Sequence, residues 1–157
     1  MFMKRNNIIE TVTILYIILF LYTGISKMME YSVFKEQLAS SPVLSPFANI
    51  IAILLPLTEI LLVLLLIVPR WRLKGLYSSV LLMLSFTIYI IIILSFSDKL
   101  PCSCGGAISL LSWQQHLVFN GAFLTLGVWA ITLEKQLKNQ NRIEWETPTK
   151  NEIGTIA

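Results

Sequence analysis

The sequence has few charged residues, and this shortage excludes an ordinary soluble domain. Only 13% of the 157 residues are Asp, Glu, Lys or Arg, whereas 55% are hydrophobic. A soluble domain carries about 25% charged residues. The mean hydropathy of +0.73 agrees with this interpretation. The composition therefore predicts an integral membrane protein, and one domain, because the predicted spans use most of the chain.

Cysteine and histidine are also scarce. The chain has two cysteines and one histidine. A structural zinc site needs four such ligands, so this chain alone cannot supply a complete set. We therefore predict no metal cofactor.

The basic residues do not form a stripe of the kind that binds nucleic acid. The net charge is +3, but the twelve Lys and Arg residues are scattered at the ends of apolar runs. In a membrane protein, basic residues at these positions set the topology. We therefore interpret them as topology signals and exclude nucleic acid as a partner.

The apolar runs predict an all-α fold, a bundle of four transmembrane helices, in a membrane domain over residues 1–133. About 20 residues at 1.5 Å each cross a hydrocarbon core of about 30 Å. The predicted spans are 7–26, 47–68, 75–96 and 113–132. The first run follows a basic start, but it is longer than a signal peptide's apolar core and no A-x-A cleavage site follows. We expect it to be retained as a span.

The segments outside the spans are polar or short. A short helix is expected at 33–39, within the connector 28–47. The tail 134–157 is polar, and we predict that it is cytoplasmic and disordered beyond a short helical extension. Trp71, Trp113, Trp129 and the tyrosines are predicted to anchor span ends at the membrane interface rather than to surround a cofactor.

The distribution of positive charge predicts the orientation. With four spans, three basic groups fall on one side: Lys4 and Arg5, then Arg70, Arg72 and Lys74, and last Lys135, Lys138 and Arg142. Basic residues are enriched in cytoplasmic loops. We therefore predict a multi-pass protein of the bacterial inner membrane with both termini in the cytoplasm. The segment 97–112 would then face the periplasm.

The two cysteines lie in the polar break between the last two spans. The sequence there is Pro101-Cys102-Ser103-Cys104-Gly105-Gly106. An outward location permits a disulfide, but a Cys-x-Cys bridge closes a very small ring, which makes it strained and labile. Such a bridge suits thiol–disulfide exchange better than stabilisation. The alternatives are two inert, reduced thiols or one half of a metal site.

Four polar residues in or near the spans are candidate site residues. Glu59 lies near the middle of the second span, where a carboxylate is costly unless paired or hydrated. It could relay protons or hold a quinone ring, or it could lock the bundle by a hydrogen bond. Lys27 is its nearest candidate partner by depth. His116 could move protons, or it could be an interfacial residue. Asn120 shares its helix face and is expected to bond between helices rather than to a ligand.

These residues occur in an order that resembles a known family. The order is Gly24-x-x-Lys27, Leu55-Pro56-x-x-Glu59, Cys102-x-Cys104-x-Gly106, and then His116 with Asn120. Over about residues 8–133 it resembles the MauE/DoxX family of redox-associated bacterial membrane proteins. The form Pro-Cys-Ser-Cys-Gly-Gly…Ser-Trp-x-x-His is similar to its Bacteroidetes-type branch. One departure is Gly105, because many MauE loops have an aromatic residue there.

The resemblance implies a thiol–disulfide or a quinone-linked role, and the first hypothesis combines the two in periplasmic disulfide exchange. MauE is associated with maturation of a disulfide-rich periplasmic dehydrogenase subunit, and DoxX-type proteins with quinone-linked sulfur oxidation. A thioredoxin-like periplasmic protein would be the partner. Cys102 and Cys104 would exchange disulfides, one attacking and the other resolving, while His116 and Glu59 handle protons. The quinone would be held by three residues, Lys27, Glu59 and Asn120.

A second hypothesis places the protein in another class. It would be a non-catalytic membrane subunit that assembles or anchors a larger envelope complex. The segments 28–47 and 97–112 would form its contact surface, with the cysteines closing a local clip. The chain would then be no thiol–disulfide oxidoreductase. The sequence leaves both hypotheses open, together with the direction of electron flow and the order in which the cysteines react.

Overall fold

The computed structural model describes residues 2–41, 44–96 and 113–146, and within these ranges it contains helices and no strand. The elements are α1 (Phe2–Met29), α2 (Tyr31–Ser40), the 3-10 helix η1 (Ser45–Phe47), α3 (Ala48–Ile67), α4 (Arg72–Phe96) and α5 (Trp113–Glu146). The all-α prediction is confirmed. The predicted helix at 33–39 is also present, as part of α2.

Four of these helices are long and apolar enough to cross a membrane. The spans run over Arg5–Met29, Ser45–Ile67, Arg72–Ser95 and Gln115–Gln140. Each contains one predicted span or nearly all of it, so the four-span prediction is confirmed. The helices extend beyond the predicted bounds because hydropathy marks the apolar stretch, whereas polar end residues can continue the helix. This is clearest in α5, which continues to Glu146.

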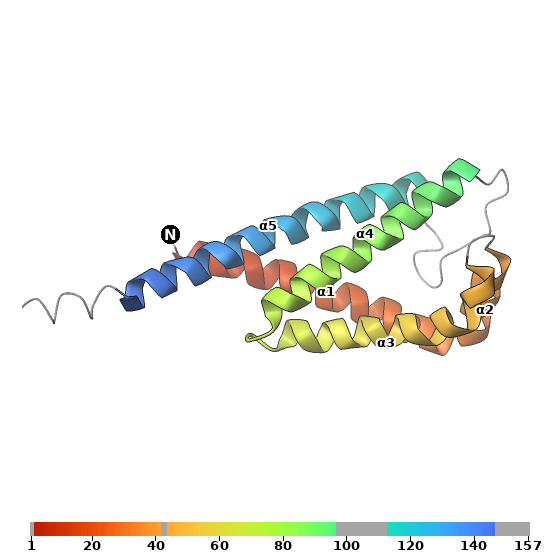
Figure 1. Ribbon diagram of the computed structural model, residues 1–157, viewed down its shortest axis with the longest axis horizontal. Coiled ribbons are helices and arrows are strands. Elements are labelled where there is room, and N and C mark those ends of the chain that lie inside the picture. The colour runs from red at the N-terminus through yellow and green to blue at the C-terminus, as the bar shows by residue number, and fades with distance from the viewer. Residues whose placement is uncertain (1, 42–43, 97–112, 147–157) are drawn as a thin grey trace, which may run out of the picture.

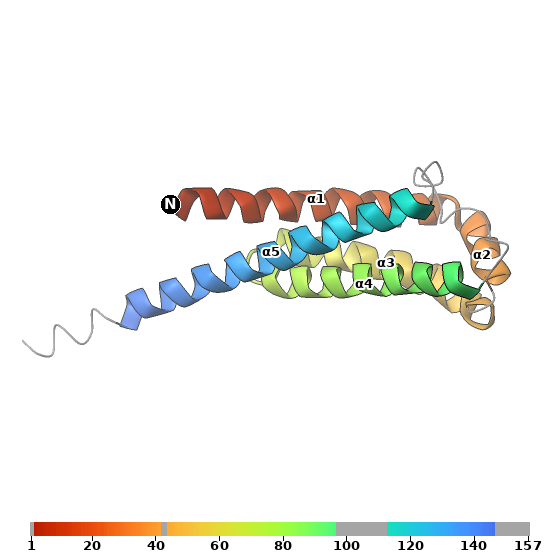
Figure 2. The same cartoon turned by 90° about the horizontal axis from the view of Figure 1, so that it is seen from above.

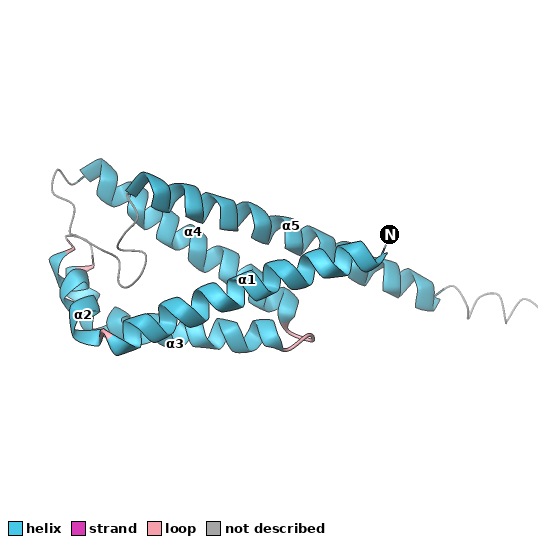
Figure 3. Cartoon of the chain, turned by 180° about the vertical axis from the view of Figure 1, so that it is seen from behind, coloured by secondary structure: helices cyan, strands magenta, loops and turns pink. Residues whose placement is uncertain are grey.

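The long helices alternate in direction. Helix α1 packs mainly against α3, and α4 mainly against α5, as Figure 1 shows. Helix α2 lies across one end of the bundle (Figure 2), where it packs mainly against α3. The start of α1, the turn between α3 and α4, and the last turns of α5 lie at the opposite end (Figure 3). The assignment of that end to the cytoplasm stays a prediction.

Side chains spaced one turn apart on α1 begin the core. Val12, Tyr16 and Phe20 are buried, and each is four residues from the next. Positions four apart lie on the same helix face. They pack with buried residues of the other long helices: Leu62, Val63, Leu66, Leu76, Met83, Ala130 and Ile131.

The outer faces of the helices are apolar as well. Ile18, Leu61, Leu81 and Val128 lie within the spans, and their exposed fractions are 59%, 55%, 65% and 52%. Apart from the position of Pro56 in α3, which lacks an N–H, backbone groups within these spans can be satisfied inside their own helix, which is the condition for crossing lipid. The exposed apolar surface therefore faces the bilayer.

Tyr16 corrects one prediction from the sequence. It was expected with the other tyrosines to anchor a span end, but it is fully buried in the bundle, with a relative exposure of 0%. Its hydroxyl donates a hydrogen bond to the carbonyl oxygen of Phe123 on α5, at 2.6 Å. The prediction was wrong because Tyr16 lies mid-helix, where only a partner on another helix could satisfy the hydroxyl.

Candidate functional site

A buried ion pair joins α1 to α3. The Nζ of Lys27 lies 2.8 Å from Oε1 of Glu59, and the two side chains are 12% and 1% exposed. A charge removed from water is tolerated when it is paired and hydrogen-bonded. The partnership predicted from the depth of the two residues is therefore present.

Gly24 lets the two helices approach at this pair. It lies one turn before Lys27 on α1. A Cβ atom at this position would be 3.3 Å from Cδ1 of Ile60 and 3.4 Å from Cβ of Glu59. The absence of a side chain leaves room for α3, so Lys27 can reach the carboxylate. This explains the spacing of the Gly24-x-x-Lys27 motif.

The ion pair lies in the wall of a cavity of about 330 Å³ between the helices. Most of its lining is apolar, with Phe20, Leu55 and Phe119 among the residues. The polar side chains in the lining are Thr23, Lys27, Glu59, Ser85, Tyr89, His116 and Asn120. A mostly apolar cavity with a few converging polar groups is the usual form of a small-molecule site.

Two buried polar atoms in this lining have no hydrogen-bond partner within the part of the chain that the structure describes. They are Oε2 of Glu59 and Nδ2 of Asn120. Thr23 stands near the carboxylate, but its hydroxyl bonds to the carbonyl oxygens of Leu19 and Phe20, at 3.0 and 3.4 Å. Buried polar groups are usually satisfied by protein, water or a ligand. The cavity thus offers an acceptor and a donor.

Asn120 departs from its predicted role. An interhelical hydrogen bond was expected, yet the amide nitrogen makes none among the described residues. His116 and Asn120 do share a helix face, as predicted, and both line the cavity. The spacing fixed their common face, whereas the position of the neighbouring helices left the Asn120 nitrogen buried without a hydrogen-bond partner among the described residues.

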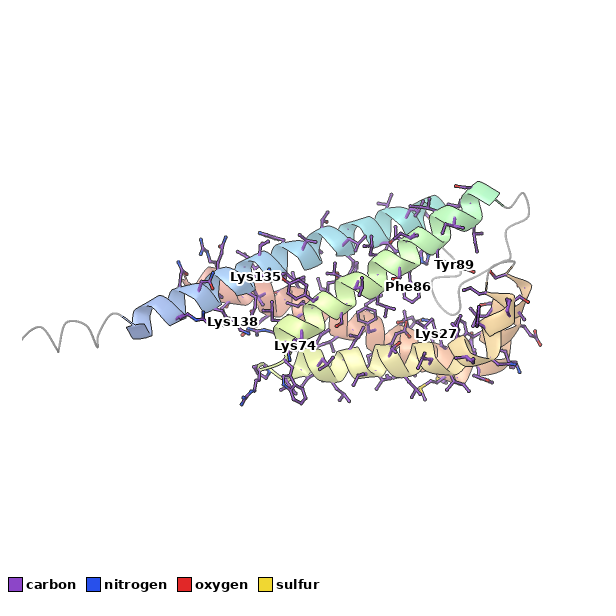
Figure 4. The ribbon with its side chains drawn as sticks, viewed as in Figure 1. Lys27, Lys74, Phe86, Tyr89, Lys135 and Lys138 are labelled. Carbon is purple, nitrogen blue, oxygen red and sulfur yellow. The ribbon has the colours of Figure 1, made fainter. Side chains whose placement is uncertain are left out.

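Helix α2 closes the cavity at its end of the bundle. Phe34 and Leu38 are the buried residues of α2, and both line the cavity. The ring of Phe34 lies 5.8 Å from Nζ of Lys27, within the range of a cation–π contact. Figure 4 shows Lys27 toward this end of the bundle.

Tyr89 is a site residue that sequence reasoning missed. It was grouped with the interface anchors, but it lines the cavity together with Phe86. Its hydroxyl donates to Oγ of Ser41, at the end of α2, at 2.9 Å. Both aromatic residues lie on α4 near the α2 end (Figure 4). Because Phe86 and Tyr89 are three residues apart, the sequence indicated that they share a face of α4. It could not indicate that this face is the one that lines the cavity.

The structure thus brings four predicted site residues together: Lys27, Glu59, His116 and Asn120. Cys102 and Cys104 lie outside the described residues. Their segment joins the end of α4 to the start of α5, both at the α2 end of the bundle. No group of three or more potential metal-ligating residues occurs in the described ranges.

Comparison with known proteins identifies the family. The profile of the methylamine utilisation protein MauE matches residues 5–133. The chain belongs to the MauE family. The match begins in α1 and ends within α5, so the MauE region contains the ion pair, the cavity and the cysteine segment. No curated protein and no solved structure matches the chain.

Proposed function

We propose that this multi-pass MauE-family protein serves a membrane redox system by exchanging disulfides with periplasmic proteins, and that its cavity holds a quinone. The observation that carries the proposal is the cavity itself. It contains a buried Lys27–Glu59 ion pair and two polar atoms that have no hydrogen-bond partner among the described residues. It also lies at the end of the bundle where the cysteine segment connects α4 to α5.

The residues of the cavity fit a quinone ring. A volume of about 330 Å³ lies at the lower end of the range for small-molecule sites. Lys27 and Asn120 offer N–H donors for ring carbonyl oxygens, and His116 is a further candidate donor. Phe86 and Phe119 supply aromatic surface. When bound, a quinone would supply a membrane-soluble acceptor for two electrons and two protons.

The exchange itself involves only thiols. A thiolate of the partner attacks the Cys102–Cys104 disulfide, forming a mixed disulfide and releasing one cysteine as a thiolate that takes up a proton. The partner's second thiolate then attacks the mixed disulfide and releases the other cysteine. The partner loses two electrons and gains a disulfide, and the chain gains two thiols. This direction follows from the strain of the small Cys-x-Cys ring, which makes its disulfide a strong oxidant.

Glu59 and His116 are the candidates for proton transfer. The Oε1 of Glu59 is held by Lys27, whereas Oε2 is free to accept a proton within the cavity. His116 lines the same cavity from the start of α5, twelve residues after Cys104. An imidazole can give up and take up protons near neutral pH. Both residues would therefore transfer protons between the cysteines and the cavity.

Trapping experiments test the exchange. The Cys102→Ser and Cys104→Ser variants have no disulfide of their own, but their remaining thiolate can attack the disulfide of the oxidised partner, which is the reverse of the exchange. The chain then has no second cysteine to resolve the mixed disulfide, so at least one variant should accumulate a covalent adduct with an envelope protein. Ser103→Ala keeps both thiols and should accumulate none. The readout is a reducible band on a non-reducing gel. If neither cysteine variant forms an adduct and both keep function, the exchange proposal is wrong.

The quinone content of the purified protein tests the cavity. Asn120→Leu removes the amide from the lining and should lower the amount of co-purified quinone at least about fivefold, since losing a hydrogen bond to a buried polar group costs about 1–3 kcal/mol. Asn49→Leu changes an exposed amide on α3 and should leave the content unchanged. Equal content in both variants would contradict a quinone in this cavity.

Purification in mild detergent distinguishes the assembly hypothesis from the exchange proposal. A stoichiometric envelope complex that survives the double change of Cys102 and Cys104 to Ser would support a non-catalytic subunit. Loss of the partner in that variant would support exchange instead.

A further inference from the structure

The end of the bundle opposite the cavity carries a second feature, which the proposed redox function does not use. Three lysines, Lys74 on α4 and Lys135 and Lys138 on α5, are exposed there. Figure 4 shows all three near this end, away from Lys27. With Tyr77 they form what we name the basic end cluster. We propose that this cluster binds the headgroup of an anionic phospholipid.

The geometry of the cluster is set by one contact between the helices. The Nζ of Lys135 lies 5.1 Å from the centre of the Tyr77 ring. Lys74 is one turn before Tyr77 on α4, and Lys138 is one turn after Lys135 on α5. Because α4 and α5 run in opposite directions, both steps lead toward the same end of the bundle. The three lysines therefore lie on neighbouring turns of two packed helices, at the same end of the bundle.

The positive charge of the cluster is not compensated. Glu134, the adjacent acid on α5, is already paired with Arg72, with Nη2 at 3.2 and 2.9 Å from its two oxygens. The ion pairs found among the described residues are this one and Lys27–Glu59, so the lysines of the cluster have no carboxylate there. The Arg72 pair also fixes α4 against α5 at the level of the cluster.

The basic end cluster lies at the depth expected for the lipid headgroups. The span in α4 begins at Arg72 and the span in α5 ends at Gln140, so Lys74 and Lys138 lie close to the membrane boundary. Lysine side chains at such positions extend toward the phosphates. Each basic residue near an anionic membrane surface contributes about 1 kcal/mol of attraction.

The surface beside the cluster favours a lipid over a soluble anion. Leu81 lies one turn from Tyr77 on α4 and is 65% exposed, and Ile88 continues the same face at 49%. A lipid bound by its phosphate at the lysines would lay its acyl chains along this apolar face. A free phosphate ion would leave that face unused. Positive charge beside an apolar surface thus matches the anionic headgroup and the acyl chains of a phospholipid.

Native mass spectrometry of the full-length protein tests the proposal. The probes are phosphatidylglycerol, phosphatidylcholine with the same acyl chains, and inorganic phosphate. We expect phosphatidylglycerol to stay bound, and the other two to be lost. Changing Lys74, Lys135 and Lys138 together to Gln should weaken phosphatidylglycerol binding about fivefold for each lysine, or roughly a hundredfold in total.

A matched control is Lys35→Gln, which removes an exposed lysine from α2 at the other end of the bundle. It should bind phosphatidylglycerol like the unchanged protein. Melting temperatures without added lipid check that each variant is folded, since all four lysines are exposed. Equal phosphatidylglycerol binding by the triple variant and the control would overturn the proposal. Equal retention of phosphatidylcholine, or retention of inorganic phosphate alone, would overturn it as well.

Discussion

Lys27 and Glu59 are the two residues on which the cavity depends most. Their side chains meet at 2.8 Å, and Glu59 is only 1% exposed. Taking either charge out of water costs several kcal/mol, and their mutual attraction offsets that cost. A change that removes one partner therefore leaves an uncompensated charge, whereas removing both leaves none. This asymmetry makes the pair testable through stability alone.

Lys27→Met should destabilise the protein by about 3–5 kcal/mol, because it leaves the Glu59 carboxylate buried without its partner. The double variant Lys27→Met, Glu59→Gln should recover most of that loss. Thermal unfolding in detergent measures the stability of both variants. The control is Lys35→Met, which changes an exposed lysine on α2. If Lys27→Met were as stable as the double variant, the buried Glu59 carboxylate would not depend on Lys27 to offset its charge.

Helix α5 lies close to helix α1 at Gly127. A Cβ atom there would clash with the hydroxyl of Tyr16 and with Val80, so three helices converge at this glycine. The same Tyr16 hydroxyl bonds to the carbonyl oxygen of Phe123, one turn earlier on α5. Small residues permit such close approach in membrane bundles, where packing and hydrogen bonds hold helices together. At Gly121, nearly two turns before Gly127, an added Cβ atom would meet nothing within 4 Å.

Gly127→Ala should therefore cost about 1–3 kcal/mol of stability through overpacking. Gly121→Ala should be neutral or stabilising by up to about 1 kcal/mol, because Ala favours a helix and meets nothing here. Unfolding free energies of the two variants in the same detergent give the comparison. If Gly127→Ala were as stable as Gly121→Ala, α1 and α5 would not be closely packed at this point.

At the scale of the whole molecule, the four spans give the bundle two distinct ends. One end carries α2, and the other carries the start of α1, the α3–α4 turn and the last turns of α5 (Figure 1). The cavity lies toward the α2 end, because Phe34 and Leu38 of α2 line it. Arg70 lies in that turn, and the basic end cluster is nearby. The positive-inside rule predicts that this end is cytoplasmic. The cysteine segment would then face the periplasm.

Labelling of intact cells checks this orientation. After mild reduction, a membrane-impermeant maleimide should react with the native Cys102 and Cys104. In a background with both changed to Ser, Arg70→Cys should react only after the membrane is permeabilised. The opposite pattern would invert the topology, and with it the proposed exchange with periplasmic proteins.

The sequence by itself determined the number of spans and identified four of the seven polar residues that line the cavity. Four long apolar runs can satisfy their backbone groups in lipid only as helices, which fixes the fold class without knowledge of packing. Polar residues in such runs are costly, so Glu59 stood out, and depth alone suggested Lys27 as its partner. The spacing of His116 and Asn120 fixed their common face.

Only the tertiary structure decided which polar groups find partners. Tyr16 and Tyr89 occur in apolar runs much as an anchoring tyrosine would, yet one is buried against α5 and the other bonds to Ser41 at the end of α2. The free nitrogen of Asn120 and the Arg72–Glu134 pair likewise depend on how neighbouring helices sit. Lipid and protein interiors are similarly apolar, so hydropathy cannot tell the lipid-facing side of a helix from its packed side; that choice is made by interhelical packing and hydrogen bonds.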